Sequence, residues 1–246
     1  MITSSEVGRH GGGARSLKRC STISIRCKLI RTYSAALSSL AFIYAEDSFM
    51  QVSGLPVREL RQRSVNLAER AIAVDDGDAY AHQMIGTAFL DLGELDRAKQ
   101  HLELALTLNP HFPSTTINLG CTIAFMGLHS QGLDLIAKAF SIDARLPPAM
   151  QSVPFMVHSL AGHPDEAIGY LNRMQNPYAY LHMMMAACFA HFDRMDEAKQ
   201  QLALFEAKRS PTFEVPGLAS VLTRCLRLLE DKARLLDGFR KLGIDV

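Results

Sequence analysis

The sequence has no tryptophan, no apolar stretch long enough to span a bilayer and no two cysteines in a C-x-x-C spacing. The apolar stretch at residues 35–45 falls short of the about 20 residues that a spanning helix needs, so no membrane span is expected. The five cysteines include no C-x-x-C pair, which argues against a zinc site and favours a reducing compartment.

Catalytic signatures are missing as well. There is no G-x-x-x-x-G-K-[ST] phosphate loop, no G-x-S-x-G and no H-E-x-x-H. Among the nine histidines, His82 and His182 fall within apolar helical patterns, where we expect them to pack between helices. We therefore predict that the protein is not an enzyme, with no catalytic residues, no metal site and no cofactor.

Positive charge is concentrated at the start of the chain. Residues 1–34 hold seven Lys or Arg and the single acid Glu6, a net charge of +6, whereas the remainder has a net charge of −5. The remainder shows no basic stripe, so no nucleic acid is expected as a partner. We predict that residues 1–33 form a disordered basic extension of a cytoplasmic protein. Their Arg- and Ser-rich composition leaves a mitochondrial transit peptide, and hence an organellar adaptor, as the alternative.

Small residues recur at a fixed interval of 34 positions. Gly86 and Gly120 are separated by this interval, and so are Gly93 and Gly127. A period of this length is typical of a solenoid of stacked helix pairs. The sequence therefore predicts an all-α solenoid.

Residues 79–112 form the clearest unit, with two apolar helical segments on either side of a turn at residues 92–95. We expect the two helices to cross closely at Gly86, with Phe89 and Leu102 filling the space on either side. This pattern resembles the tetratricopeptide repeat (TPR) family. The resemblance implies a right-handed superhelix of helix pairs that serves as a protein-binding scaffold.

The TPR resemblance divides the chain into about five helix pairs and a C-terminal pair. Residues 34–213 are predicted to hold the repeats, and residues 214–246 to form capping helices that cover the open end of the array. The first repeat has an enlarged turn that contains residues 53–56. The predicted repeats are 34–78, 79–112, 113–146, 148–177 and 179–212.

The end of the chain carries a narrower resemblance. Residues 235–244, LLDGFRKLGI, look like the end of TPR regions that follow class III adenylate cyclase or winged-helix DNA-binding domains in multidomain proteins of proteobacteria, notably rhizobia. The resemblance implies a docking module of bacterial signalling without cyclase activity of its own. An alternative is that the chain is a detached C-terminal regulatory region of such a cyclase or transcriptional regulator. The sequence also does not decide whether Met1 is the true start.

In TPR arrays the first helix of each pair lines a concave groove, and the resemblance implies that a protein or peptide partner binds there. Counting along the repeats places ten residues in this groove: Tyr80, Gln83, Thr87, Ile117, Cys121, Phe125, Met156, Tyr180, Met183 and His191. None of them is Lys, Arg or Asn, so an acidic peptide terminus is not the expected ligand. Flexible Met and aromatic side chains suit an apolar or amphipathic helix instead.

The same ten residues could be packing core rather than a contact surface, because one sequence does not fix the phase of each helix. If they contact a partner, replacing Phe125 and Met183 by alanine abolishes binding with little change in the melting temperature. If they are core, the same replacement collapses the fold. The sequence predicts neither the identity of the partner nor the oligomeric state.

Overall fold

In a computed structural model, the chain is described over residues 11–142, 146 and 148–245, and it contains no strand in these ranges. None of the helices in this part of the chain combines the length and the apolar composition that a bilayer crossing requires. The elements in chain order are α1 (Gly11–Met50), α2 (Val57–Val74), α3 (Ala79–Asp91), α4 (Leu95–Leu108), α5 (Pro113–Phe125), α6 (His129–Ile142), the 3-10 helix η1 (Pro148–Gln151), α7 (Ser152–Ala161), α8 (Pro164–Asn172), α9 (Ala179–His191), α10 (Met195–Lys208), α11 (Val215–Cys225) and α12 (Leu229–Lys241).

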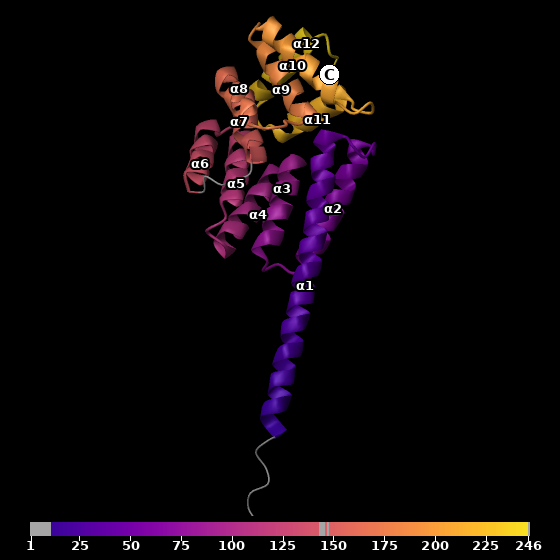
Figure 1. Cartoon of the computed structure of the whole chain (residues 1–246), viewed down its shortest axis with the longest axis vertical. Helices are drawn as coiled ribbons and strands as arrows, with labels where there is room; N and C mark the ends of the chain where they lie inside the picture. Colours follow the sequence, from indigo (N-terminus) through magenta and orange to yellow (C-terminus); the bar gives the residue numbers. More distant parts are fainter. Residues whose placement is uncertain (1–10, 143–145, 147, 246) are drawn as a thin grey trace, which may run out of the picture.

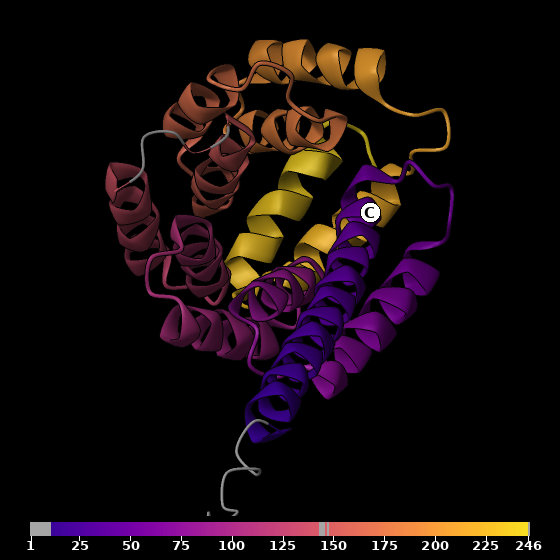
Figure 2. The same ribbon diagram turned by 60° about the horizontal axis from the view of Figure 1, so that its bottom comes forward.

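Successive helices form pairs: α1 with α2, α3 with α4, α5 with α6, α7 with α8, and α9 with α10. Each pair also packs on the next one, through contacts such as α1 with α3, α4 with α5 and α7 with α9. Figure 2 shows that the pairs follow one another around a ring from α1 to α10. The prediction of an all-α solenoid of helix pairs is therefore confirmed.

Local sequence explains where these helices begin and how closely they pack. The side chain of Asp78 accepts a hydrogen bond from the Tyr80 amide at 3.0 Å and so caps the start of α3. Gly86 in α3 faces α4, and a Cβ atom added to it would lie 2.7 Å from Leu102 Cγ. The close crossing expected at Gly86 is therefore present, and it depends on the absence of a side chain there.

The start of the chain differs from the prediction. Residues 1–10 of the predicted disordered extension lie outside the described residues, whereas residues 11–33 form the first half of α1. This half projects beyond the ring (Figure 1). Residues 14–33 contain neither Gly nor Pro, so the helix that packs on the ring from Ser34 onward can continue toward the N-terminus.

The C-terminal helices also lie elsewhere than predicted. Residues 214–246 are predicted to cover the open end of the array, but α11 lies against α1 and α3, and α12 packs on α9 and α7. Figure 2 shows α12 in the middle of the ring. The reason is that the buried side of α12, with Leu235 and Phe239, finds its apolar neighbours on the inner helices. We call residues 214–245 the tail.

Candidate partner-binding groove

The residues predicted to line the groove lie on the inner helices α3, α5, α7 and α9, and most of them are not accessible. Eight of the ten are buried, namely Gln83, Thr87, Ile117, Cys121, Phe125, Met156, Tyr180 and Met183. Tyr80 is exposed, and His191 is partly exposed. In this conformation, the inner face is therefore packed interior rather than an open surface.

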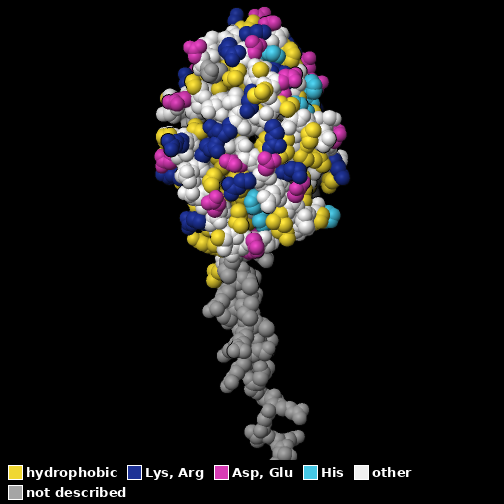
Figure 3. Space-filling model, turned by 180° about the vertical axis from the view of Figure 1, so that it is seen from behind, with side chains coloured by type: hydrophobic (Ala, Val, Ile, Leu, Met, Phe, Trp, Pro, Cys, Tyr) yellow, Lys and Arg dark blue, Asp and Glu magenta, His cyan; other side chains and the backbone are white. Residues whose placement is uncertain are grey.

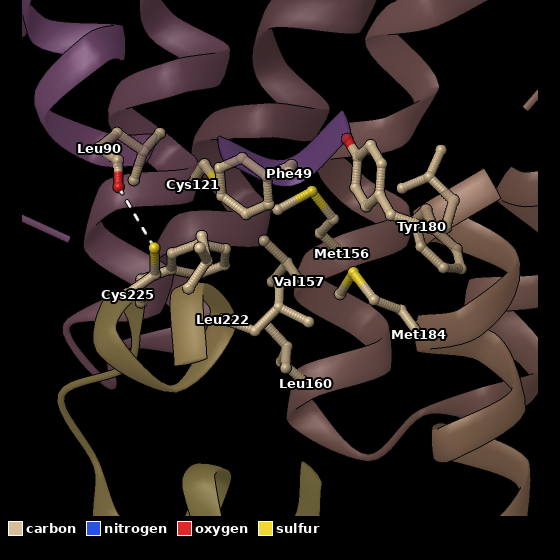
Figure 4. Packing of buried hydrophobic residues seen from close by; sticks show 14 of the residues in the cluster. Phe49, Leu90, Cys121, Met156, Val157, Leu160, Tyr180, Met184, Leu222 and Cys225 are labelled. Atoms are coloured by element: carbon tan, nitrogen blue, oxygen red, sulfur yellow. Dashed lines mark hydrogen bonds between the residues drawn. The ribbon is translucent and has the colours of Figure 1, made fainter. Parts of the chain in front are cut away.

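Side chains of α11 contribute to this interior. Figure 4 shows Leu222 and Cys225 of α11 in one packed cluster with Val157 and Leu160 of α7 and with Met184 of α9. The same cluster includes several of the residues predicted to bind a partner. The tail thus occupies the place that the sequence assigns to a partner.

The tail crosses the C-terminal ends of the inner helices in chain order. Each inner helix offers one of its last carbonyl oxygens to a donor of the tail: Leu90 of α3 to Cys225 Sγ at 3.5 Å, Phe125 of α5 to the Arg227 amide at 2.9 Å, Leu160 of α7 to the Arg234 guanidinium, and His191 of α9 to Lys241 Nζ at 2.9 Å. The last carbonyls of a helix have no partner within the helix, so the tail satisfies those of Phe125, Leu160 and His191, whereas the Leu90 carbonyl also accepts from the Gly93 amide at 2.9 Å. The repetition of the contact along the array fixes the path of the tail.

A buried carboxylate holds α12 in the ring. Asp231 is 1% exposed and accepts hydrogen bonds from His129 Nε2 at 2.9 Å and from Arg234 at 3.1 Å. Near the other end of α12, His191 Nδ1 donates to Asp237 at 2.6 Å, and this hydrogen bond lowers the pKa of the Asp237 carboxyl. These two pairs connect the tail to the start of α6 and to the end of α9.

The loop between α1 and α2 holds the beginning of the tail. Gln51 Nε2 donates to the Glu214 carbonyl at 3.0 Å, and Gln51 Oε1 accepts from the Glu214 amide at 2.7 Å. This loop belongs to the enlarged turn that the sequence predicts for the first repeat. Part of that insertion therefore makes a contact within the chain.

Thiols in the interior are kept protonated. Burial raises the pKa of Cys225 to about 12 and raises that of Cys121 well above its ordinary value. A protonated thiol is a poor nucleophile. Among the residues that the structure describes, no three His, Cys, Asp or Glu side chains gather into a metal site. These groups have the character of packed core.

Two histidines lie at equivalent positions in separate repeats and pack between helices. His82 Nε2 donates to the Asp76 carbonyl at 2.7 Å, so its Nδ1 is the acceptor for His101 Nδ1 at 2.9 Å. In the other repeat, His182 Nδ1 bonds to Gln201 Oε1 at 2.8 Å. Both histidines are buried, and each has a side-chain partner, His101 or Gln201, on the second helix of the same pair.

The His82–His101 pair predicts a sensitivity to acid. Burial, together with the charges of His82 and Arg97, lowers the pKa of His101 to about 4. The unfolded chain takes up this proton near pH 6.5 and the folded chain does not. The contribution of the neutral His101 to the free energy of unfolding is therefore fully present above about pH 6.5, and it is lost as the pH falls toward about 4. Allowing for partial exposure, we expect a loss of about 1–2 kcal/mol between about pH 7 and about pH 5.

Replacing His101 by glutamine tests this expectation, because the repeat of His182 already uses a glutamine at the equivalent position. Urea denaturation of the wild type and of His101→Gln at the two pH values measures the difference. The variant should lose less stability on acidification than the wild type by the amount attributed to His101. Equal losses in the two proteins would mean that His101 does not titrate as proposed.

Sequence reasoning finds the inner face but misses the donors of the tail. Cys225, Arg227, Arg234 and Lys241 have no periodic counterpart in the repeats. One signal is available in the sequence: Asp231, Leu235 and Phe239 are spaced four residues apart, which predicts one buried side of a helix. Nothing in that spacing says which helices it covers.

Comparison of the sequence with models of known protein families gives no match, and comparison with curated proteins gives none either. Among solved structures, the fold is similar to TTC0263, a TPR protein of Thermus thermophilus. The TM-score is 0.53 at 16% identity, and the match covers 80% of this chain and 99% of that chain.

Two further TPR-like structures give lower TM-scores. PilF of Pseudomonas aeruginosa has a TM-score of 0.48 at 16% identity, covering 85% of this chain and 92% of that one. YrrB, a TPR protein with an unusual peptide-binding site, has a TM-score of 0.42 at 18% identity, covering 72% of this chain and 92% of that one. At such identities the likeness to TTC0263 concerns the fold alone: the chain has the helical solenoid of TPR proteins.

Proposed function

We propose, on the basis of this fold, that the chain is a non-catalytic protein-interaction module whose inner face binds an amphipathic helix of a partner. Its own tail occupies this face until the partner displaces it. The observation that carries the proposal is the position of α12 in the middle of the ring, against α9 and α7. The residues predicted to bind a partner helix pack in the same core as this tail.

The tail indicates what kind of helix the inner face accepts. In α12, Leu235 and Phe239 are buried, whereas Glu230 and Arg240 are exposed. Gly238 lies against the backbone of α9, and Arg234 reaches the end of α7. A fitting partner is therefore an amphipathic helix with two large apolar residues one turn apart, a small residue beside them and a basic side chain for a helix end.

Gly238→Leu tests whether the inner face is a binding site. Even a Cβ atom at Gly238 would lie 2.0 Å from the Ala187 carbonyl oxygen, so leucine is expected to push α12 away from α9. The full-length variant should then bind a fluorescently labelled peptide of residues 214–246, measured by fluorescence anisotropy. The wild type should bind it weakly, because its tethered tail competes at a high effective concentration.

Gly169→Leu is the matched control, because a Cβ atom at Gly169 meets nothing within 4 Å, and it should behave like the wild type. The double variant Arg234→Ala, Lys241→Ala loosens the tail without adding bulk, and it should also gain peptide binding. If both tail variants keep the helical content of the wild type and bind no more peptide than it does, the inner face is only core and the proposal fails.

We further propose that the module acts in bacterial signalling in the cytoplasm, as the resemblance of residues 235–244 implies. In this chain those residues include Leu235 and Phe239, so the part that resembles cyclase-linked TPR regions is also the part that fills the ring. A class III adenylate cyclase or winged-helix domain is then the region that the module controls. A cyclase assay of such a catalytic domain, with and without this chain, tests the idea, and an unchanged rate contradicts it.

A further inference from the structure

The outward side of α1 carries a stripe of exposed apolar residues. Leu29 is 64% exposed, Tyr33 52%, Leu40 41% and Ile43 56%, and Ala36 between them is exposed as well. The intervals along this stripe are four, three, four and three residues. This is the spacing at which two helices pack along each other in a coiled coil.

From Tyr33 to Ile43 no charged residue accompanies the stripe, whereas Leu29 lies between Lys28 and Arg31 in the sequence. Residues 32–45 contain no Asp, Glu, Lys or Arg, although part of this segment faces solvent. Elsewhere the surface is different: Figure 3 shows positive and negative side chains interspersed among apolar ones over the face of the ring that it presents. A continuous uncharged apolar strip of this length on an exposed helix is typical of an interaction surface.

The described part of the chain leaves this stripe exposed. The opposite side of α1 packs into the ring through Leu37, Ala41 and Ala45, which are buried. The Tyr33 hydroxyl accepts a hydrogen bond from Arg70 of α2 at 3.3 Å, so the ring of Tyr33 rather than its polar end is left for a partner. Since the inner side of α1 is already used, a partner must approach from outside the solenoid.

We propose that a second copy of this chain docks on this stripe, with the two α1 helices antiparallel and a two-fold axis at Ala36. The spacing of the stripe is close to symmetric about that residue. In this arrangement Tyr33 of each copy meets Leu40 of the other, and Leu29 meets Ile43. The small Ala36 lies at the crossing, where the helices come closest. A surface that complements itself in this way forms a closed two-fold dimer.

Charge and length also favour a second copy. An uncharged stripe meets no like charge when it faces itself, whereas a charged one would repel its copy. α1 is a helix of 40 residues, and its N-terminal part projects beyond the ring, which leaves room beside it for the other copy (Figure 1). Antiparallel pairing about Ala36 brings residues 29–43 of the two copies side by side, a contact about 20 Å long.

Sedimentation velocity of the full chain over a wide concentration range measures this dimer. The wild type should have twice the mass of one chain. Leu40→Glu should raise the dissociation constant about a hundredfold, because it places an unpaired charge in the contact. Leu108→Glu is the matched control: Leu108 in α4 is 43% exposed but lies outside the stripe, so this variant should stay dimeric.

Disulfide trapping separates the two-fold arrangement from other dimers. In a background with Cys20 and Cys27 replaced by serine, Ala36→Cys should form a covalent dimer on mild oxidation and Leu29→Cys should not. Cross-linking of both variants would indicate parallel helices, and cross-linking of neither would exclude contact at Ala36. A wild type that stays monomeric at every concentration, or a Leu40→Glu variant that dimerises like the wild type, would overturn the proposal.

Discussion

Replacing Phe125 and Met183 together by alanine is expected to bring the chain close to global unfolding. Phe125 is 2% exposed and Met183 1%, so each replacement leaves a cavity in the packed interior. Such changes cost about 3–5 kcal/mol for phenylalanine and about 2–5 kcal/mol for methionine. The whole free energy of unfolding of a protein is commonly about 5–15 kcal/mol, so the double variant loses a large part of it.

Chemical denaturation followed by far-UV circular dichroism measures this loss for the two single variants and the double variant. Ile142→Ala, a large-to-small change at the exposed end of α6, is the control and should change the stability by about 0.5 kcal/mol or less. A double variant that unfolds with the wild type would show that these side chains form an accessible contact surface. The partner-binding hypothesis drawn from the sequence would then apply even with the tail in place.

Arg234→Met is expected to cost about 3–5 kcal/mol, because it leaves the carboxylate of Asp231 without its cation. Asp231 is almost fully buried and would keep only the hydrogen bond from His129. The Leu160 carbonyl at the end of α7 would lose its donor at the same time. Methionine retains an apolar stem of similar length, so the effect reports the charge and the hydrogen bonds rather than lost volume.

Arg227→Met supplies the comparison within the same tail. Arg227 also forms an ion pair, with Asp96 at 2.7 Å, but both side chains are exposed. Exposed pairs contribute about 0–1 kcal/mol, so this variant should unfold near the wild type. Differential scanning calorimetry of the two variants distinguishes them directly. Two equally small shifts would mean that Asp231 does not depend on Arg234, and that α12 is held by its apolar side alone.

The repeating part of the fold can be predicted from the sequence because its contacts are local. Gly86 and Leu102 touch across one helical hairpin, and the same spacing returns in the next repeat with Gly120 and Ile136. A fixed interval in the sequence therefore reports a fixed contact in space. The inner face follows from the same interval, which is why the predicted groove residues do lie on the inner helices.

The position of the tail could not be predicted in this way. Its contacts join Cys225 to Leu90, Asp231 to His129 and Glu214 to Gln51, pairs separated by 135, 102 and 163 residues. The donors of the tail are spaced unevenly along the chain, so their contacts leave no period in the sequence of the tail. The prediction of a disordered segment is wrong for residues 11–33 for another reason. The three glycines and the basic composition favour disorder, but residues 14–33 contain no Gly or Pro that would break a helix.

The position of the tail at the end of the chain also determines when the inner helices are covered during synthesis. The tail is synthesised after every repeat, so the inner helices leave the ribosome before the segment that covers them. At about 5–20 residues per second, α11 and α12 follow the last repeat by a few seconds. During that interval the ends of the inner helices that the tail later contacts are uncovered on a nascent chain. A helix present at the site of synthesis thus meets an open ring, whereas a helix that arrives later must compete with the finished protein's own end.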